Sequence, residues 1–207
     1  MLHNSIHSLI QRYGIISDQV EVNELTTLLT ELQQTLQTIP DGVIVEFGCF
    51  AGTTSLYVRR LLNELENESE FHVYDSFTGL PDKTAQDLSP AGEQFKAGEL
   101  SASKKEFITN FKKANLKLPI IHKGWFSDFK ADDVPERISF AFLDGDYYQS
   151  IKDSLELVWP KLQPGATVIV DDYMNEALPG AQKAVDEWLK QHPAKLVTIH
   201  SLAIIHT

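Results

Sequence analysis

Acidic side chains recur at the ends of the predicted strands. Glu46 lies within the first strand, Asp75 closes the second, and two pairs follow the fourth and fifth strands, Asp144 with Asp146 and Asp171 with Asp172. If the last two strands are neighbours, these pairs converge, and like charges at close range raise one another's pKa or require a cation. Because the ligands would be oxygens without Cys or His, the set favours Mg²⁺, with Mn²⁺ or Ca²⁺ as alternatives, over zinc. Asp-rich turns also cap helices, and Asp146 could cap the helix that follows it.

A glycine-bearing turn between a strand and a helix is the second candidate site. Within residues 43–55, an apolar run meets Glu46 and then two glycines, Gly48 and Gly52. Glycine tolerates the positive φ of a sharp turn and lets a ligand approach the backbone closely. Thr53 begins a run of three hydroxyl residues beside the unpaired amides of a new helix. The turn therefore predicts a ligand site, with a purely structural helix start as the alternative.

The absence of two known motifs from this loop narrows the class of ligand that it could bind. A dinucleotide fingerprint needs glycine where Phe50 stands, and a Walker A loop needs Gly-Lys-Ser/Thr where Thr53 follows Gly52. Glu46 would repel a pyrophosphate, whereas it could pair with the ammonium of an amino-acid-like cofactor. A cationic, zwitterionic cofactor such as S-adenosylmethionine fits this loop best.

Together the two sites predict a transfer reaction. A substrate oxygen bound to the metal ion would have a lowered pKa, and a carboxylate outside the metal shell could take its proton. The sulfonium methyl held by the glycine loop would then face that oxygen, so positioning and charge neutralisation would supply most of the acceleration. Asp75 stands 23 residues beyond Gly52, where an acid accepts hydrogen bonds from ribose hydroxyls, unless it is only a solvated strand end. Trp125 and Phe126 could stack on an adenine, with packing in the core as the alternative.

The elements that must position these residues alternate between strands and helices. The predicted strands are 43–47, 71–75, 119–122, 138–143, 166–170, 195–199 and 202–206. This order predicts an α/β fold with a doubly wound, parallel sheet and a terminal antiparallel hairpin. Residues 1–39 are predicted to be a helical extension on one edge of the domain, and 162–165 a turn. Residues 76–103 are predicted to be a lid or binding loop.

Composition narrows the classes of partner. The 207-residue chain suits one domain with a full-sized core, and its net charge of −11 disfavours nucleic acid and anionic membranes. Cys49 is the only cysteine, which predicts a reducing compartment. No apolar stretch has spanning length, and no signal-like segment follows Met1, so we expect a soluble cytoplasmic protein. A homo-oligomer is compatible with the sequence.

Five motifs stand in order over about residues 42 to 190. They are Val45–Gly48 with Gly52, Tyr74–Pro81, Lys123–Phe126, Leu143–Tyr148, and Pro164–Gly165 followed by Val170–Tyr173. Together they resemble the macrocin O-methyltransferase family, within the class I S-adenosylmethionine-dependent methyltransferases. The resemblance implies a Rossmann-like, mostly parallel seven-stranded sheet in a methyltransferase domain over residues 40–207. It also implies Mg²⁺ at the ends of strands four and five and methylation of a hydroxyl, in known cases on a sugar of a macrolide.

The resemblance also assigns roles, motif by motif. Asp144, Asp171 and Asp172 correspond to metal ligands and Asp146 to the catalytic base, although Asp144 and Asp146 could exchange roles. The cofactor-binding set is Glu46, Gly48, Gly52, Thr53, Asp75, Ser76, Gly124, Trp125 and Asp144. In this set Asp75 would hold the ribose, Trp125 the adenine, and Glu46 with Gly48 the methionine end. The segments expected to cover the acceptor match the family loosely, so the acceptor is not inherited.

We therefore expect a Mg²⁺-dependent O-methyltransferase that acts on a small hydroxylated molecule, sugar or phenol-like. A nucleotide-dependent oxidoreductase on a Rossmann-like fold is one alternative, and Phe50 in place of the middle glycine speaks against it. A second alternative is a cofactor-binding module that has lost methyl-transfer activity. Such a module would have no reason to retain mutually repelling acids at the ends of two strands. The Gly and Pro content of residues 79–98 further predicts a segment that orders only when ligands bind.

Overall fold

A seven-stranded sheet organises the protein. The computed structural model describes residues 2–92 and 94–207, with side chains from residue 6 onward. The strands are β1 Val43–Phe47, β2 Phe71–Asp75, β3 Ile120–Lys123, β4 Ile138–Leu143, β5 Leu162–Val170, β6 Lys195–Ile199 and β7 Leu202–His206. They follow the order β3-β2-β1-β4-β5-β7-β6. The first five pair in parallel, whereas β7 pairs antiparallel with both β5 and β6, so the predicted fold class and terminal hairpin are confirmed.

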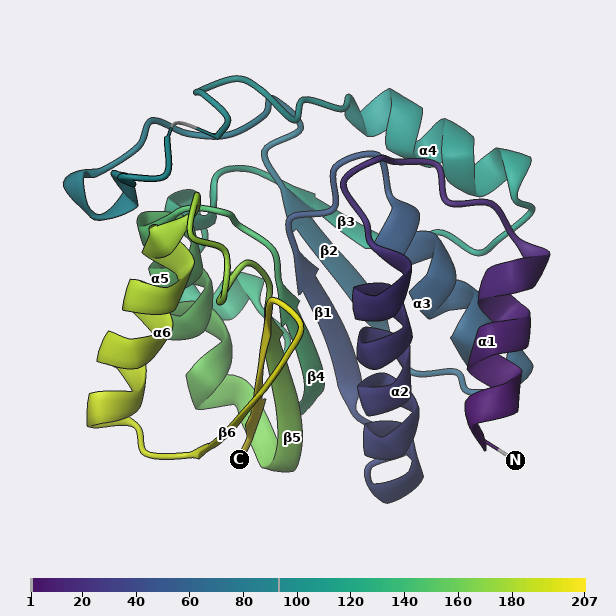
Figure 1. The fold of residues 1–207 in the computed structure, drawn as a ribbon. Coiled ribbons are helices and arrows are strands. Elements are labelled where there is room, and N and C mark those ends of the chain that lie inside the picture. The colour runs from purple at the N-terminus through teal and green to yellow at the C-terminus, as the bar shows by residue number, and fades with distance from the viewer. Residues whose placement is uncertain (1, 93) are drawn as a thin grey trace.

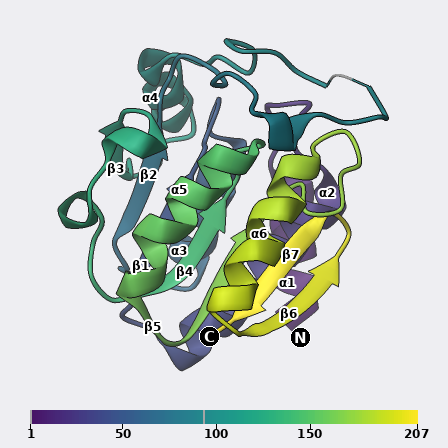
Figure 2. The ribbon, with the colours of Figure 1, turned by 90° about the vertical axis from the view of Figure 1, so that its left-hand side faces the viewer.

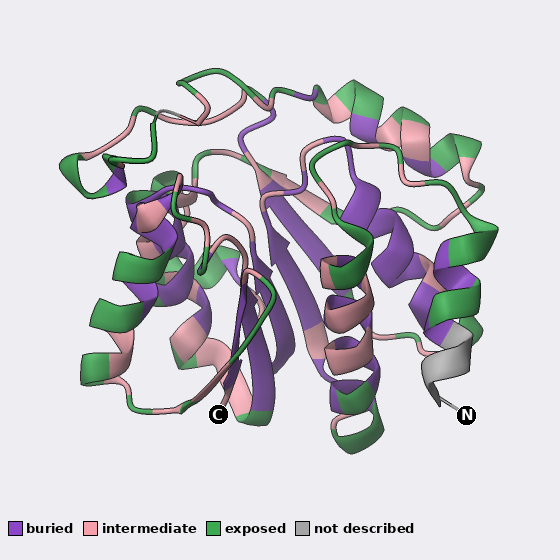
Figure 3. Cartoon of the chain, viewed as in Figure 1, coloured by how far each residue is buried: buried purple, intermediate pink, exposed green. Residues whose placement is uncertain are grey.

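Helices cover both faces of this sheet. They are α1 Leu2–Arg12, α2 Val22–Thr38, α3 Thr53–Glu64, α4 Lys104–Lys113, α5 Tyr148–Val158 and α6 Pro179–Gln191. In Figures 1 and 2, α5 and α6 lie on one face and α1, α2 and α3 on the other. Each face has its own apolar core, and buried residues fill the central strands (Figure 3). Alternation along β1 sends Val45 and Phe47 toward α5, and Ile44 with Glu46 toward α3.

The N-terminal helices belong to the core rather than to an edge of the domain. Leu29 and Leu32 of α2 are fully buried in the same cluster as Phe140 of β4, and the hydroxyl oxygens of Thr35 and Thr167 are 2.8 Å apart. The expectation of edge packing was therefore wrong. The apolar side of α2 packs against β4 and β5, so the helix covers the middle of the sheet.

Strand β5 begins four residues earlier than predicted. Leu162 already pairs with Ile138, but the next pair is Thr167 with Phe140, so the register shifts between them. Gly165, at a φ of 83°, allows the extra residues to bulge out of the ladder. The Pro-Gly sequence thus marks a bulge inside a strand, not the turn before it.

Residues 76–92 and 94–103 arch across the carboxyl ends of the strands (Figures 1 and 2). One short 3₁₀ turn, Ala85–Asp87, interrupts this irregular segment, and residue 93 lies outside the described residues. Its ordering on ligand binding stays a prediction. Within the described ranges, none of the helices combines the length and apolar character needed to cross a bilayer.

Candidate active site

A cavity of about 470 Å³ lies at the carboxyl ends of the strands. Its walls come from the ends of β1, β2, β4 and β5, the segment before α2, and the loop of residues 79–100. Nine carboxylic acids line it, namely Asp18, Glu21, Glu24, Asp75, Asp144, Asp146, Asp171, Asp172 and Glu176. Among the described residues, no Lys, Arg or His side chain shares this lining. The cavity therefore suits a cationic or neutral ligand and repels an anionic one.

Most of the predicted site residues meet in this cavity. Those that line it are Gly48, Asp75, Ser76, Trp125, Asp144, Asp146, Asp171 and Asp172. The remaining four, Glu46, Gly52, Thr53 and Gly124, do not line it. Gly52 precedes the first residue of α3 at a φ of 92°, and an added Cβ would lie 2.8 Å from the Phe107 ring, so both backbone conformation and packing require glycine there.

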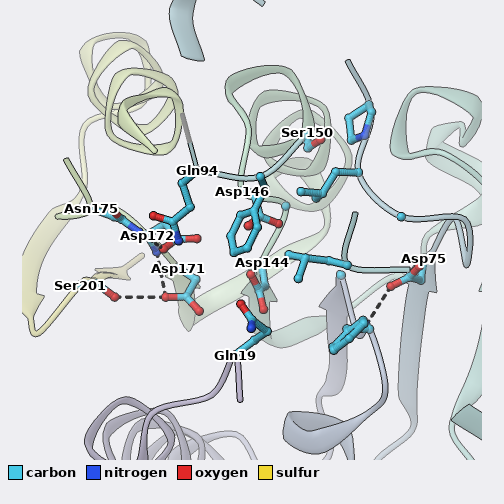
Figure 4. A pocket seen from close by; sticks show the side chains of 18 of the residues that line it. Gln19, Asp75, Gln94, Asp144, Asp146, Ser150, Asp171, Asp172, Asn175 and Ser201 are labelled. Atoms are coloured by element: carbon cyan, nitrogen blue, oxygen red, sulfur yellow. Dashed lines mark hydrogen bonds between the residues drawn. The ribbon is translucent and has the colours of Figure 1, made fainter. Parts of the chain in front are cut away.

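The four aspartates are brought together by strand pairing. Leu143 is paired with Val170, so the turns that follow β4 and β5 are adjacent, and Figure 4 shows their carboxylates facing one cavity. The Oδ1 atom of Asp171 accepts a hydrogen bond from the Asp172 amide at 2.8 Å and from the Ser201 hydroxyl at 3.2 Å. Asp172 accepts one from the Asn175 side chain at 2.9 Å. This convergence was the main expectation from the sequence.

Burial and mutual repulsion keep these carboxyls from ionising together. Burial raises the pKa of Asp144, and the charges of Asp171 and Asp146 raise it further. Burial, followed by the charge of Asp172, raises the pKa of Asp146 and brings that of Asp171 to about 7. An added cation, or protons, must therefore balance the cluster near neutral pH.

The chemical type of the four aspartates favours a divalent metal ion, whereas the spacing of their side chains does not form a ready metal site. Four carboxylates without sulfur or nitrogen form the oxygen-rich set that Mg²⁺ prefers. In the described part of the chain, however, no three His, Cys, Asp or Glu side chains are gathered closely enough to hold a metal. The chemistry of the residues thus fits Mg²⁺, and its binding stays a proposal.

The glycine loop forms a cradle beside these acids. Gly48 has a φ of 87°, and an added Cβ would lie 1.8 Å from the carbonyl oxygen of Asp144. Asp75 holds the loop, because its Oδ2 atom accepts hydrogen bonds from the amides of Cys49 at 2.8 Å and Phe50 at 3.1 Å. Its Oδ1 atom accepts one from the amide of Phe77 at 2.6 Å. The structure thus gives Asp75 a loop-shaping part that the sequence did not reveal.

Glu46 lies beneath this loop as a buried acid. Its side chain is 1% exposed, and its Oε2 atom accepts a hydrogen bond from the Ser55 hydroxyl at 2.5 Å. Its Oε1 atom has no hydrogen-bond partner among the described residues. Burial raises the pKa of Glu46 to about 8. A buried acid with an unsatisfied oxygen is suited to receive a cationic group, which is the part that an ammonium of the cofactor would play.

One wall of the cavity was not anticipated from the sequence. Asp18, Glu21 and Glu24 come from the end of the α1–α2 connection and the start of α2. The Ser201 hydroxyl, in the turn between β6 and β7, donates to a carboxylate oxygen of Glu24 and also contacts Asp171. These contacts join segments that are far apart in the chain. Only the three-residue spacing of the acids could have suggested a common face.

A family model and curated proteins match this chain. The family model, described as Macrocin-O-methyltransferase (TylF), matches residues 12–205. The 8-demethyl-8-(2,3-dimethoxy-alpha-L-rhamnosyl)-tetracenomycin-C 4'-O-methyltransferase of Streptomyces olivaceus is 32% identical over 160 residues, which are 72% of this chain and 61% of that protein. The demethyldecarbamoylnovobiocin O-methyltransferase of Streptomyces niveus is 31% identical over 161 residues, which are 71% and 58% of the two proteins. The chain thus spans about three fifths of the length of these relatives.

A solved structure extends the likeness to the fold. The structure of the O-methyltransferase NovP superimposes with a TM-score of 0.76 at 26% identity, and the match covers 90% of this chain and 80% of that one. The likeness therefore extends over most of the sheet and the helices that cover it.

Proposed function

Because the chain belongs to the macrocin O-methyltransferase family, we propose that it transfers a methyl group from S-adenosylmethionine to a hydroxyl of a small acceptor, a sugar or other natural-product-like molecule. One observation carries the proposal: Gly48 of the cradle and the four aspartates line a single cavity. The relatives support the acceptor class, since the names of two of them specify O-methylation of a rhamnosyl-bearing tetracenomycin and of demethyldecarbamoylnovobiocin.

The donor end of the cavity suits S-adenosylmethionine. Gly48 presents only backbone atoms to the cavity that it lines, and Asp75 stands at the end of β2, where an acid can accept hydrogen bonds from ribose hydroxyls. Trp125 is 38% exposed and lines the cavity, so its ring is free to stack on an adenine. Glu46, with its unsatisfied Oε1 atom, is assigned to the ammonium of the methionine end. Gly52, Thr53, Ser76 and Gly124 are assigned to the same cofactor-binding set, and of these four Ser76 lines the cavity.

Methyl transfer to a hydroxyl requires a base that removes the hydroxyl proton of the acceptor. When bound, S-adenosylmethionine supplies a sulfonium methyl, and transfer breaks the carbon–sulfur bond, forms a carbon–oxygen bond and releases S-adenosylhomocysteine. The acceptor hydroxyl loses its proton to a carboxylate oxygen of Asp146, which is 8% exposed and lines the cavity. A pKa raised by burial and by Asp172 makes that carboxylate a stronger base once it is ionised. Asp144 is the alternative base.

The remaining acids of the cavity are assigned to binding a cation and to selecting the charge of the acceptor. Asp144, Asp171 and Asp172 would hold Mg²⁺, which when bound supplies positive charge beside the reacting oxygen. Ser201 and Asn175 orient Asp171 and Asp172 through their hydrogen bonds. The rest of the acidic lining selects acceptors without negative charge, because an anionic group would be held among several carboxylates. Neutral and amine-bearing glycosides are the acceptors that fit.

The proposal is tested by separating donor binding from transfer. Calorimetry should detect binding of S-adenosylhomocysteine but not of NAD, which also distinguishes the enzyme from an oxidoreductase. Replacement of Asp146 by Asn should lower kcat by roughly 10²- to 10⁴-fold, the contribution of a general base, with donor affinity unchanged within about twofold. Asp132→Asn, at an exposed position, is the matched control. Unimpaired transfer by Asp146→Asn would remove Asp146 from the mechanism.

A further inference from the structure

One buried acid outside the cavity is not explained by the proposed chemistry. Asp87 lies in the 3₁₀ turn of the long loop and is 2% exposed. Its Oδ2 atom accepts hydrogen bonds from the amide of Thr84 at 2.8 Å and from its hydroxyl at 2.7 Å. Its Oδ1 atom accepts one from the backbone amide of Tyr148 at 2.7 Å. Both carboxylate oxygens are thus committed to fixed partners, one within the loop and one in a helix.

The partner amide belongs to the first residue of α5. Helix starts leave several amides without intrahelical acceptors, and the residue before this helix, Tyr147, provides no side-chain cap. Asp87, 61 residues away in the chain, supplies the acceptor, and its negative charge also complements the positive end of the helix dipole. The long loop therefore caps α5, the helix that follows the turn carrying Asp146.

The structure makes room for this contact. Gly180 lies near the start of α6, and an added Cβ there would be 1.9 Å from the Oδ1 atom of Asp87 and 2.6 Å from the amide nitrogen of Tyr148. The Lys183 side chain donates to the carbonyl oxygen of Gln86 at 2.5 Å. The Ser89 hydroxyl donates to the carbonyl of Glu176 at 2.6 Å. Residues 84–89 are thus docked at the starts of both α5 and α6, and we call this contact set the Asp87 anchor.

The anchor joins two parts of the candidate active site. Asp146 lies two residues before Tyr148 and adopts a φ of 58°, a left-handed conformation that persists only where the surroundings hold it. On both sides of the anchor the loop lines the cavity, through Gly79–Pro81 and Gln94–Phe95. A shift of residue 87 would therefore move the base and the cavity wall together.

We infer that Asp87 is a positioning residue for methyl transfer: it fixes the turn that carries Asp146 and ties the loop over the cavity to that turn. This inference rests on the proposed function, because it assigns Asp87 a part in presenting the base. It predicts that loss of the anchor lowers turnover while the donor cradle, whose loop is held by Asp75, stays intact.

Two substitutions and a control test the anchor. Asp87→Ala removes both acceptors and should lower kcat about 100-fold, the effect of a misplacement near 1 Å. The KM for S-adenosylmethionine and the affinity for S-adenosylhomocysteine should change by less than about threefold. Asp87→Asn retains an oxygen for the Tyr148 amide, so it should restore part of the lost turnover. Asp82→Ala removes an exposed acid of the same loop and should behave as wild type.

Amide hydrogen exchange at Tyr148 provides a readout that does not depend on catalysis. We expect exchange at least about tenfold faster in Asp87→Ala than in wild type, because the amide loses its acceptor. Wild-type kcat in Asp87→Ala, an equal loss in Asp82→Ala, or unchanged exchange at Tyr148 would each overturn the inference. If Asp87→Ala does not fold, Gly180→Ala decides, because its added Cβ would lie 1.9 Å from the Oδ1 atom of Asp87 and displace it from the Tyr148 amide. Wild-type turnover in that variant would refute the anchor. If wild-type protein transfers no methyl group, the proposed function fails, whereas the exchange rates still test the contact.

Discussion

Replacement of Glu46 by Gln would isolate the effect of one buried acid on stability. Burial raises the pKa of this carboxyl from its ordinary 4.5 to about 8 in the folded protein. Below pH 4.5 the group is protonated in both the folded and the unfolded state. Between pH 4.5 and 8 the unfolded chain releases the proton and the folded chain keeps it, so the free energy of unfolding falls as the pH rises. Above pH 8 the loss is complete.

The size of the loss follows from the two pKa values. At about 1.4 kcal/mol for each tenfold change in proton affinity, the rise of the Glu46 pKa to about 8 corresponds to about 5 kcal/mol between pH 4.5 and 8. This is an upper limit, because relaxation around the ionised group recovers part of it. The glutamine side chain of the Glu46→Gln variant cannot ionise, and its amide nitrogen in the place of the unpaired oxygen costs about 1–3 kcal/mol at every pH. The variant should therefore be the less stable protein at pH 5 and the more stable one at pH 9.

Urea unfolding without cofactor, at several values of pH from 5 to 9, measures this crossing. Asp171 contributes to both proteins and cancels in the difference. Asp144 does not cancel fully, because the charge of Glu46 helps to raise the pKa of Asp144, and its loss in the variant acts in the same direction as the predicted crossing. Glu156→Gln, at an exposed position, is the matched control and should give a curve parallel to that of wild type. A constant difference between Glu46→Gln and wild type over this range would show that Glu46 ionises normally in the folded state.

Two further predictions concern the cradle and the acids. Gly48→Ala places a Cβ 1.8 Å from the Asp144 carbonyl oxygen and a side chain at positive φ, and the positive φ alone costs about 1–2 kcal/mol. Calorimetry should show that the affinity for S-adenosylhomocysteine falls at least about tenfold. Wild-type affinity in this variant would contradict the cradle. Asp171→Asn should weaken Mg²⁺ binding and lower transfer, with donor affinity nearly unchanged. Full turnover in that variant would exclude the metal from the mechanism.

Local sequence patterns were sufficient for the parts of the fold that depend on neighbours in the chain. The apolar runs with acids at their ends predicted the strands and their arrangement in a parallel sheet, and the five motifs predicted the family, which is confirmed. The convergence of Asp144 and Asp171 followed from one further assumption, that β4 and β5 are adjacent. That adjacency is confirmed.

The features that the sequence did not reveal depend on contacts between distant segments. Nothing near Asp87 indicates that it caps α5, because the partner amide lies 61 residues away. Likewise Glu24 reaches the cavity only because α2 packs over the middle of the sheet, and its contact with Ser201 joins residues 177 positions apart. In β5, the pairing of Leu162 beyond the bulge outweighs the local turn preference of Pro164 and Gly165.

The central claim is that a methyl donor and a hydroxyl meet in the acidic cavity. The most direct measurement incubates the protein with S-adenosylmethionine labelled in its methyl group and a panel of neutral, amine-bearing and anionic glycosides, with Mg²⁺ or with a chelator. We predict labelled methyl ethers of neutral or amine-bearing acceptors, none of the anionic ones, and a loss of product with the chelator. Binding of S-adenosylhomocysteine without labelled product from any acceptor, or labelling confined to the anionic ones, would contradict the account.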